Sequence, residues 1–521
     1  MLERLGLLWS VCGGVPGAGL PPAFFPSTLF SQNPTLSRFP HDLPLPASAS
    51  ANARAWIAAW RAKLGSSPAA PPMNISSSPP RTANGALAIP SDLRSLAAAA
   101  TSIAAEYAPK LALVGTLAAG EAGAKALAAA AGTTFPPALL GMAALLAALT
   151  ALSSTSPSTA DALQAAAAPG LDWVSRWLPL FYVPSLVVLP IAVRGIAPPD
   201  LARMLAIIAA GMPATLLATA ALVVSIRKLV NTPAGPPPPS DPPKPFTQRH
   251  YVGWGAAGVG SLAAAALGVG DPGRVAALFM LASTVLGYLG GVSLPARVRS
   301  VAHPVIVCAA AANAGAAVLG AATGAGYDAV LAAYLTKGVA GAAWGAGDGL
   351  MSLLGVVILS FAFRIHAQRG LVKRHAAEIG GAAVGSAAFS MAITAAAARA
   401  VGLSPDLARA LVPRSVTVAL ALPIAATLGA PASITAAGVV LTGLLGANFA
   451  QALLTWAGYT DPIARGLATA GAAHGLGTAA LARSEPDALP FCALGYALIG
   501  VAASVLAALP PVTAALMALT G

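Results

Sequence analysis

Residues 463–481, IARGLATAGAAHGLGTAAL, combine an apolar helical pattern with side chains that can bind a polar ligand or titrate. Asp461 and Pro462, directly before this stretch, have the pattern of an N-cap and a first helical turn. His474 and Thr478 are four residues apart and share one face of a helix, where the imidazole can hydrogen-bond a substrate or exchange a proton near neutral pH. The alternative is a buried neutral histidine that binds a backbone carbonyl.

Glycines surround this histidine. Gly471 and Gly475 form a G-x-x-x-G pair, which lets another backbone come close, and Gly475 and Gly477 would keep the wall of a binding site thin. Asn448, in LTGLLGANFAQ, is a further candidate for substrate binding, although a buried amide can also hold two helices together.

A second polar group interrupts residues 412–425, VPRSVTVALALPIA. Pro413 suits a first helical turn, which places Arg414, Ser415 and Thr417 at the positive end of a helix dipole. The guanidinium is a planar fork that matches a carboxylate, and the hydroxyls can donate to carboxylate or hydroxyl oxygens. We therefore expect a binding site for a small organic anion. The alternative is an arginine that extends to the membrane surface beside a capping serine.

Two further charged groups lie in apolar surroundings. Asp348, in GAGDGLMSLLG, stands at the entrance to an apolar run, as an N-cap or as a second candidate, with His474, for proton coupling. Glu121 and Lys125 are spaced so that they are expected to neutralise each other on one helix. Transporters of small ions build sites at mid-membrane from interrupted helices, whose free backbone N–H groups solvate the substrate.

The high hydrophobic content of the chain indicates a membrane protein. Of 521 residues, 57% are hydrophobic and 9% charged, with a mean hydropathy of +0.76. Since one helical span takes roughly 20 apolar residues, we expect an all-α polytopic membrane protein with about twelve transmembrane helices. The net charge of +12 is scattered over loops and span ends, which indicates membrane topology and not nucleic-acid binding. Cys12, Cys308 and Cys492 lie far apart, so we expect no disulfide framework, no metal and no cofactor.

The chain divides into four parts by composition. Residues 1–80 hold five Lys or Arg, two acids and eleven serines, which is typical of an organellar transit peptide, although a disordered tail has a similar composition. Residues 108–230 are expected to form a small four-helix scaffold, 231–250 a proline-rich linker, and 251–521 a larger transport domain. In that domain we expect discontinuous helices related by an inverted repeat.

Apolar segments predict where the spans lie. Before the proline-rich linker they are near 111–131, 135–153, 174–194 and 203–229. After it they are near 252–269, 274–292, 301–323, 349–366, 380–401, 407–428, 432–457, 462–482 and 489–510, some of them half-length. The basic segment 364–375 should face the more negative compartment by the positive-inside rule, together with Arg227 and the arginines at 297 and 299, provided that residues 327–338 lie at the surface.

Several motifs resemble a known membrane family. PRSVT, LTGLLGA, PIARGLA and HGLGTA resemble the LrgB, or antiholin-like, family, and FPPALLGMAALLAAL and LPLFYVPSLVVLP resemble the LrgA, or holin-like, family. Their fusion behind a transit-like leader, with LVKRHAAEI, GANFAQ, DPIARGLATA and EPDALPFCALGYAL, is similar to the plastidal glycolate/glycerate translocator family of photosynthetic eukaryotes. In one departure, residues 353–358 read LLGVVI where bacterial relatives commonly show LGPAT, so a helix-breaking proline is missing from the first expected break.

The resemblance implies a carrier in the inner chloroplast envelope that exports photorespiratory glycolate and returns glycerate, by exchange or with a proton, as a homodimer in the lipid bilayer. Arg414 would bind the carboxylate, while Ser415, Thr417, His474 and Thr478 would bind the 2-hydroxyl that both acids share. One alternative is a holin-like pore. Another is an intramembrane hydrolase built on His474 and Ser415, against which stands the lack of a G-x-S-x-G or H-E-x-x-H motif.

Overall fold

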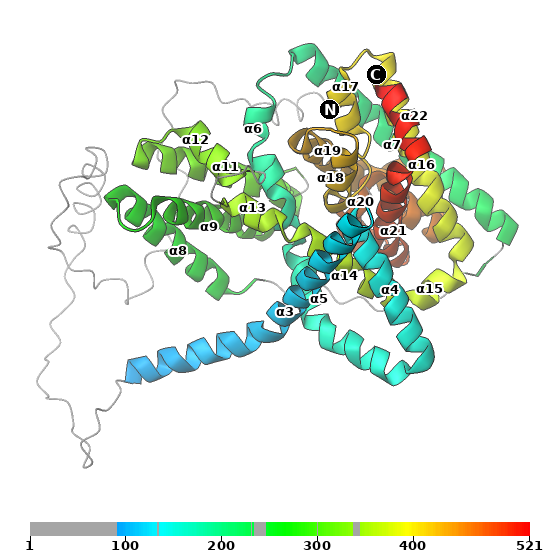
Figure 1. Ribbon diagram of the computed structural model, residues 1–521. Coiled ribbons are helices and arrows are strands. Elements are labelled where there is room, and N and C mark those ends of the chain that lie inside the picture. The colour runs from blue at the N-terminus through cyan, green and yellow to red at the C-terminus, as the bar shows by residue number, and fades with distance from the viewer. Residues whose placement is uncertain (1–90, 133–134, 231, 234–245, 300, 337–343) are drawn as a thin grey trace, which may run out of the picture. The chain divides into compact units, whose positions relative to one another are not determined.

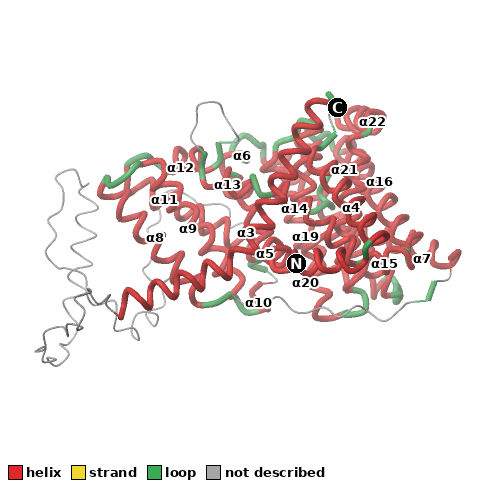
Figure 2. The backbone as a smooth tube through the Cα atoms, turned by 60° about the horizontal axis from the view of Figure 1, so that its bottom comes forward, coloured by secondary structure: helices red, strands yellow, loops and turns green. Residues whose placement is uncertain are grey.

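The computed structural model describes residues 91–132, 135–230, 232–233, 246–299, 301–336 and 344–521, and each secondary-structure element in these ranges is a helix (Figure 1). Short loops join most of the helices (Figure 2). The expected transit peptide and most of the proline-rich run lie outside the described residues.

Twenty helices make up the described part of the chain. The first five are α3 (Ser91–Ala130), α4 (Pro137–Thr155), α5 (Pro157–Val187), α6 (Leu189–Ala192) and α7 (Pro198–Val230). The next eight are α8 (Gln248–Leu267), α9 (Pro272–Ser293), α10 (Ala296–Arg299), α11 (Pro304–Thr323), α12 (Tyr327–Tyr334), α13 (Ala346–Met351), α14 (Leu354–Ala367) and α15 (Arg369–Arg374). The last seven are α16 (Ala376–Ala400), α17 (Pro405–Leu411), α18 (Val418–Thr427), α19 (Ala432–Trp456), α20 (Pro462–Ser484), α21 (Leu489–Ala508) and α22 (Pro510–Thr520).

Ten helical segments of the described chain are long and apolar enough to cross a membrane. The all-α polytopic class is therefore confirmed, with ten such segments in place of about twelve. The predicted spans at 252–269 and 462–482 correspond to α8 and α20, which are not among the ten. The one predicted at 407–428 is divided into α17 and α18.

Helix α14 lies at the centre of the packing. It contacts α3, α4, α5, α18 and α21, and residues 354–363 are all buried. Of the apolar window in α13–α14, 67% is buried inside the protein, against 17% in α4, so α4 directs most of its apolar surface outward, to where lipid lies.

An ion pair inside α3 allows this helix to approach α14. Lys125 Nζ lies 2.6 Å from Glu121 Oε1, which confirms the predicted neutralisation. The Glu121 carboxylate rests on Gly355, where an added Cβ would lie 1.8 Å from the carboxyl carbon. A larger residue at this position would displace the Glu121 carboxylate from the contact between the two helices.

Helix α7 precedes the proline-rich run but packs against α16, α19 and α20, which follow it. At its end, Arg227 Nε donates to Asp461 Oδ2 at 2.6 Å, and Arg227 Nη1 lies 3.4 Å from Glu378 Oε1. These ion pairs join the end of α7 to the starts of α16 and α20. The basic segment 364–375 directly precedes α16, so Arg227 and this segment lie at the same end of the bundle, as predicted.

The segment after α11 forms only the eight-residue helix α12, which is too short to be a span. Asp328 in its first turn is exposed and accepts two hydrogen bonds of 2.7 Å from Arg194. These bonds hold the pKa of the Asp328 carboxyl below its ordinary value. The exposed start of α12 agrees with the predicted surface position, although one face of the helix is buried and residues 337–338 lie outside the described chain.

Helix α20 is folded back on itself. His474 has φ 41° and ψ −141°, and it is the one residue other than glycine with a positive φ in the described chain. Arg465 Nε, one turn into the helix, donates to Glu485 Oε2 at 2.7 Å, whereas on a straight helix these residues would lie about 30 Å apart. Residues 462–473 and 475–484 are therefore two half-helices of a hairpin with His474 at its tip.

We expect the hairpin to enter the membrane and leave it on the same side, because its two ends meet at the Arg465–Glu485 pair. Twelve residues of helix measure about 18 Å, slightly more than half of a hydrocarbon core of about 30 Å, so the tip reaches mid-membrane. The prediction that 462–482 forms one continuous span is wrong, because the backbone reverses at His474 and the Arg465–Glu485 pair joins the two ends. Gly477 permits the fold, since a Cβ there would lie 2.6 Å from Thr469 Cγ2 in the opposite half.

Two local hydrogen-bond interactions, made by Asp461 and Arg465, fix the start of the hairpin. Asp461 Oδ1 accepts from the backbone N–H of Ala464 at 2.9 Å, which confirms the predicted N-cap. Arg465, 9% exposed, also donates to Tyr459 O at 2.7 Å. The arginine in this apolar stretch thus holds both ends of the hairpin together.

The hairpin predicts the sidedness of two exposed positions. In full-length protein in sealed vesicles, cysteines replacing Thr460 and Asp487 should react with a membrane-impermeant maleimide from the same side. A cysteine replacing Thr427, beyond the other end of the spanning helix α19, should react from the opposite side only. Labelling of Thr460→Cys and Asp487→Cys from opposite sides would show that α20 crosses the membrane. Native Cys308 and Cys492 are buried and should remain unlabelled, and the third native cysteine, Cys12, is replaced by serine in all variants.

Candidate functional site

The predicted break around Arg414 is present. Residues 412–417 form turns between α17 and α18, and the Arg414 side chain between them is 0% exposed. Its Nε donates to Thr394 Oγ1 at 2.9 Å and its Nη2 to Thr215 Oγ1 at 3.1 Å. Its Nη1 donates to Ser415 Oγ at 3.2 Å. The guanidinium therefore lies in the protein interior and does not extend to the surface.

Hydroxyl groups from two helices surround this guanidinium. On α16 they are spaced four residues apart, so they share one face, and the same holds for the pair on α7. We define the hydroxyl cluster as Arg414 with six buried side chains: Thr215, Thr219, Ser386, Ser390, Thr394 and Ser415. Two more bonds link its members, from Thr219 Oγ1 to Ser386 Oγ at 2.9 Å and from Ser390 Oγ to Ser415 Oγ at 2.7 Å.

Five members of the cluster were not predicted from the sequence. They are Thr215, Thr219, Ser386, Ser390 and Thr394. The available signal was the spacing of four between hydroxyl residues within apolar helical segments, which places a polar stripe on one face. Such a stripe alone does not reveal its partner, because serine and threonine can also bond to the carbonyl four residues before them, as Thr394 does here with Ser390 O at 2.6 Å.

The charge of Arg414 has no anionic partner in the described part of the chain, where each ion pair involves other residues. An arginine keeps its proton in proteins, so the positive charge is permanent. Burying an unpaired charge is costly, and hydroxyl dipoles compensate it only in part. Gly211 of α7 lies directly against it, since a Cβ there would be 2.4 Å from Nη2.

Thr417 is the N-cap residue of α18 and is buried. The first N–H groups of this helix have no partner within it, and they add the positive end of its dipole to the same region of the chain as Arg414. The predicted group of Arg414, Ser415 and Thr417 is thus brought together at a helix break.

His474 is held by α19. Its Nε2 lies 3.0 Å from Val439 O, and the side chain is 3% exposed, so the histidine is bound to a carbonyl as the alternative interpretation expected. Two glycines of α19 receive the tip: a Cβ at Gly443 would lie 2.5 Å from His474 Nε2, and one at Gly446 would lie 2.3 Å from Ala473 Cβ. These contacts account for the glycines in LTGLLGAN.

The hairpin meets the hydroxyl cluster at Gly471. A Cβ there would lie 2.2 Å from Ser386 Oγ and 3.2 Å from Thr219 Oγ1. The described hydrogen bonds of Arg414 and His474, however, go to different partners. The structure thus connects the two predicted groups through the first half of the hairpin, one helical turn before its tip.

The other predicted residues lie around the hairpin. Thr478 Oγ1 is 3.5 Å from Cys492 Sγ of α21, and Gly475 is near the Tyr496 ring of the same helix. Asn448 Nδ2 donates to Leu444 O of its own helix at 2.8 Å. These residues therefore position the hairpin and α19, without a described contact to Arg414.

Asp348 caps a helix. Its Oδ2 accepts from Thr336 N and Thr336 Oγ1, both at 2.9 Å, and from Gly345 N at 3.0 Å, which joins the end of α12 to the start of α13. The expected N-cap position is wrong, because Gly345 is the N-cap residue of α13 and Asp348 is the third residue of the helix. The carboxylate still contributes to capping, since it accepts from the N–H of that N-cap residue. The turn at residues 352–353 separates α13 from α14, so an interruption persists here without the missing proline.

Comparison with known proteins gives two kinds of relative. The model of the LrgB-like family matches residues 284–512. Plastidal glycolate/glycerate translocator 1, chloroplastic, of Arabidopsis thaliana is 46% identical over 396 residues, which cover 75% of this chain and 77% of that protein. Holin-like protein CidB of Staphylococcus epidermidis is 26% identical over 160 residues, which cover 31% of this chain and 70% of that protein. No solved structure matches this chain.

These matches confirm the predicted resemblance to the LrgB family. The four motifs on which it was based, PRSVT, LTGLLGA, PIARGLA and HGLGTA, all lie within residues 284–512. The LrgA-like assignment of the first block and the expected domain boundaries stay predictions.

The backbone conformation at His474 predicts that glycine is more stable than alanine at this position, the reverse of the usual order within a helix. At φ 41° and ψ −141°, a side chain is strained by about 1–2 kcal/mol relative to glycine. His474→Gly should therefore unfold at a higher temperature than His474→Ala in detergent. At Ala473, the helical neighbour, Ala473→Gly should lower the unfolding temperature of the wild type. If His474→Ala were the more stable of its pair, the tip would not hold this conformation.

Proposed function

The chain belongs to the plastidal glycolate/glycerate translocator family, and from this premise we propose that it carries glycolate and glycerate across the inner envelope membrane of the chloroplast. The observation that carries the proposal is the buried guanidinium of Arg414, a permanent positive charge among hydroxyl groups at a helix break. Both substrates are small anions with a hydroxyl next to the carboxylate, which these donors and acceptors match. Residues 1–80 would serve as the transit peptide.

The carboxylate would bind to the guanidinium of Arg414. Arg414 now donates to three hydroxyl oxygens, and a bidentate carboxylate is a stronger acceptor than any of them. The released hydroxyls of Thr215 and Ser415 can then donate to the carboxylate or to the 2-hydroxyl of the substrate. First-turn N–H groups of α18, after Thr417, would add further donors.

The hairpin would close the site from the other side. Gly471 already lies against the hydroxyl cluster, and a small shift of the hairpin changes which groups are covered. His474 and Thr478, near the tip, would bind the 2-hydroxyl in the state in which the hairpin approaches the substrate. His474 is also the candidate for proton coupling, whereas the bonds of Asp348 to Thr336 and Gly345 favour a capping role there.

Packing suggests how the chain divides for alternating access. One packing group consists of α8, α9, α11 and α12. In another, α7 contacts α16, α19 and α20. We expect α7 to move with the helices that carry the cluster, because it supplies Thr215 and covers Arg414 at Gly211. The fixed scaffold would then consist of α3–α6, and the weakly buried face of α4 would contact lipid or a second copy in a homodimer.

The competing proposal is a membrane pore, which the holin-like names of the bacterial relatives suggest. A pore needs no substrate-dependent change, whereas a carrier must bind its substrate differently in two states. A hydrolase built on His474 and Ser415 has less support: Ser415 accepts from Ser390 and Arg414, while the described bond of His474 is to Val439 O.

Counterflow in proteoliposomes tests the transport proposal. Vesicles with purified full-length protein, loaded with unlabelled glycolate, should take up labelled glycerate faster than empty vesicles, with saturation at high external glycerate. Lactate, which shares the 2-hydroxy acid group, measures how strictly the site selects. Uptake that is linear in concentration and indifferent to internal substrate would identify a pore. A dependence on an imposed pH gradient would distinguish proton coupling from strict exchange.

Replacing Arg414 tests the anion site. Arg414→Lys keeps the charge but loses the fork and most of the three hydroxyl bonds, so glycerate affinity should fall at least about tenfold, which corresponds to about 1.4 kcal/mol. The control is Arg399→Lys, an exposed arginine at the end of α16, which should transport like the wild type. An unchanged half-saturation concentration in Arg414→Lys would remove Arg414 from the substrate site.

A further inference from the structure

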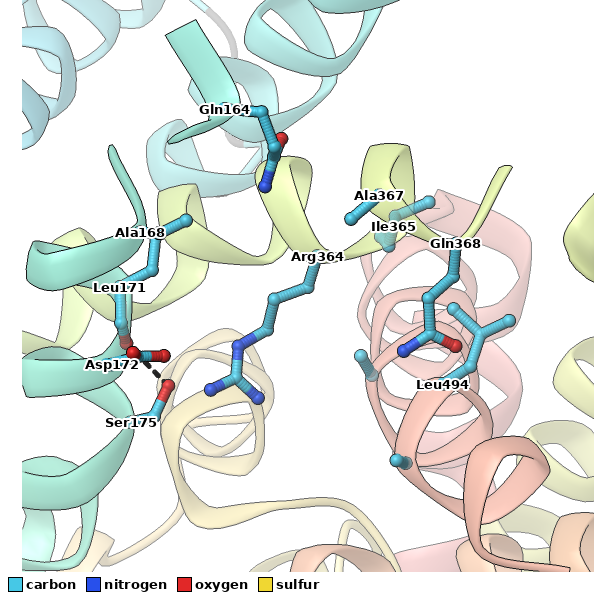
Figure 3. A pocket seen from close by; sticks show the side chains of 12 residues that line it. Gln164, Ala168, Leu171, Asp172, Ser175, Arg364, Ile365, Ala367, Gln368 and Leu494 are labelled. Atoms are coloured by element: carbon cyan, nitrogen blue, oxygen red, sulfur yellow. Dashed lines mark hydrogen bonds between the residues drawn. The ribbon is translucent and has the colours of Figure 1, made fainter. Parts of the chain in front are cut away.

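A cavity of about 280 Å³ lies between α5, α14 and α21, separate from the hydroxyl cluster. Figure 3 shows Arg364 of α14 extending into its middle, with Asp172 and Ser175 of α5 on one side and Gln368 on the other. Arg364 lies three residues before the end of its span and begins the basic segment 364–375. The cavity is therefore near the end of the membrane domain to which that segment belongs.

Polar groups of this cavity lack partners. The side-chain oxygens of Gln164 and Gln368 are buried and accept no hydrogen bond. Arg364 makes one described hydrogen bond, from Nη1 to the Tyr496 hydroxyl at 3.2 Å. Asp172 lines the same cavity, yet the ion pairs of the described chain include none between it and Arg364. Unsatisfied buried oxygens beside a cation are costly unless a ligand supplies hydrogen-bond donors and negative charge.

Tyr496 connects the cavity to the hairpin. Its hydroxyl accepts from Arg364, and a Cβ at Gly475 would lie 3.9 Å from its ring atom Cε2. The ring also packs edge-on against Phe361, with 6.1 Å between the ring centroids, which fixes its orientation. The Tyr496 side chain thus lies between Arg364 and Gly475, the residue that follows His474 at the hairpin tip.

We propose that this cavity is a second binding site for the transported hydroxy acid, which the acid occupies between the compartment facing the basic segment and the central site. The inference rests on the proposed function. The carboxylate binds to Arg364, and the substrate hydroxyls donate to the free oxygens of Gln164 and Gln368. Entry of the anion draws Arg364 away from the Tyr496 hydroxyl, while the packing against Phe361 keeps the ring beside Gly475.

The two free glutamine oxygens predict that this site prefers glycerate to glycolate. Glycerate has two hydroxyl donors and glycolate one, so two free glutamine oxygens favour glycerate at this site. Gln368→Leu removes one of these oxygens and should reduce the preference for glycerate over glycolate, while binding of glycolate changes little.

Equilibrium binding of labelled glycerate to purified full-length protein tests the site. In an Arg414→Gln background, which disables the central site, glycerate should still bind and be displaced by glycolate. Adding Arg364→Gln should weaken this remaining binding at least tenfold, and adding Arg364→Lys should weaken it less. If Arg414→Gln does not fold, Arg414→Lys provides the background. The matched control is Arg369→Gln, an exposed arginine of the same basic segment, which should leave binding within twofold.

The outcomes separate the two proposals. If the wild type performs counterflow but Arg364→Gln binds like Arg369→Gln, or if no binding remains after the loss of Arg414, the second site is refuted and the carrier stands. If the wild type neither binds nor exchanges glycerate, both proposals fail. In oriented proteoliposomes, Arg364→Gln should raise the half-saturation concentration for glycerate only from the side of the basic segment. An equal increase from both sides would also refute the second site.

Discussion

A guanidinium that cannot lose its proton, buried with no carboxylate beside it among the residues that the structure describes, is the constraint from which the arrangement of this protein follows. Arg414 is held by Thr394, Thr215 and Ser415, which come from two helices and a helix break. Hydroxyl dipoles are weaker partners than an anion, so the charge is stabilised enough to fold but not neutralised. The need to supply those hydroxyls explains why α7 and α16 carry their polar side chains at intervals of four and why α7 is glycine at the contact with the guanidinium.

The hairpin α20 is subject to a related constraint, because the polar backbone groups at its tip must also be surrounded by protein. Non-helical backbone inside a membrane is tolerated where protein surrounds it, and here α19 supplies two glycines and a carbonyl for the tip. The charged pair of Arg465 and Glu485 holds the two ends together at the opposite end of the hairpin. The strained backbone at His474 is therefore held at both ends of the hairpin, by the ion pair at the base and by α19 at the tip.

The sequence was informative where structure is set locally and much less so where distant segments meet. The break at Arg414 and the N-cap at Asp461 could be predicted, because proline, charge and capping residues act on their own neighbours. The fold-back of α20 could not, since 463–481 has the apolar length of a span and the Arg465–Glu485 pair appears only after folding. The hydroxyls of α7 were missed for the same reason: their partner follows them by about two hundred residues. The Arg364 cavity likewise combines three helices that are far apart in the chain.

The contact between Thr215 and Arg414 has a consequence for the covalent architecture. One comes before the proline-rich segment and the other after it, so the hydroxyl cluster is assembled from both blocks of the chain. A tether between two parts that must meet raises their effective concentration to the millimolar range and fixes their ratio at one to one. Fusion into a single polypeptide therefore ensures that every guanidinium is synthesised together with the threonine that solvates it, so that stoichiometry need not be maintained by separate expression of two subunits.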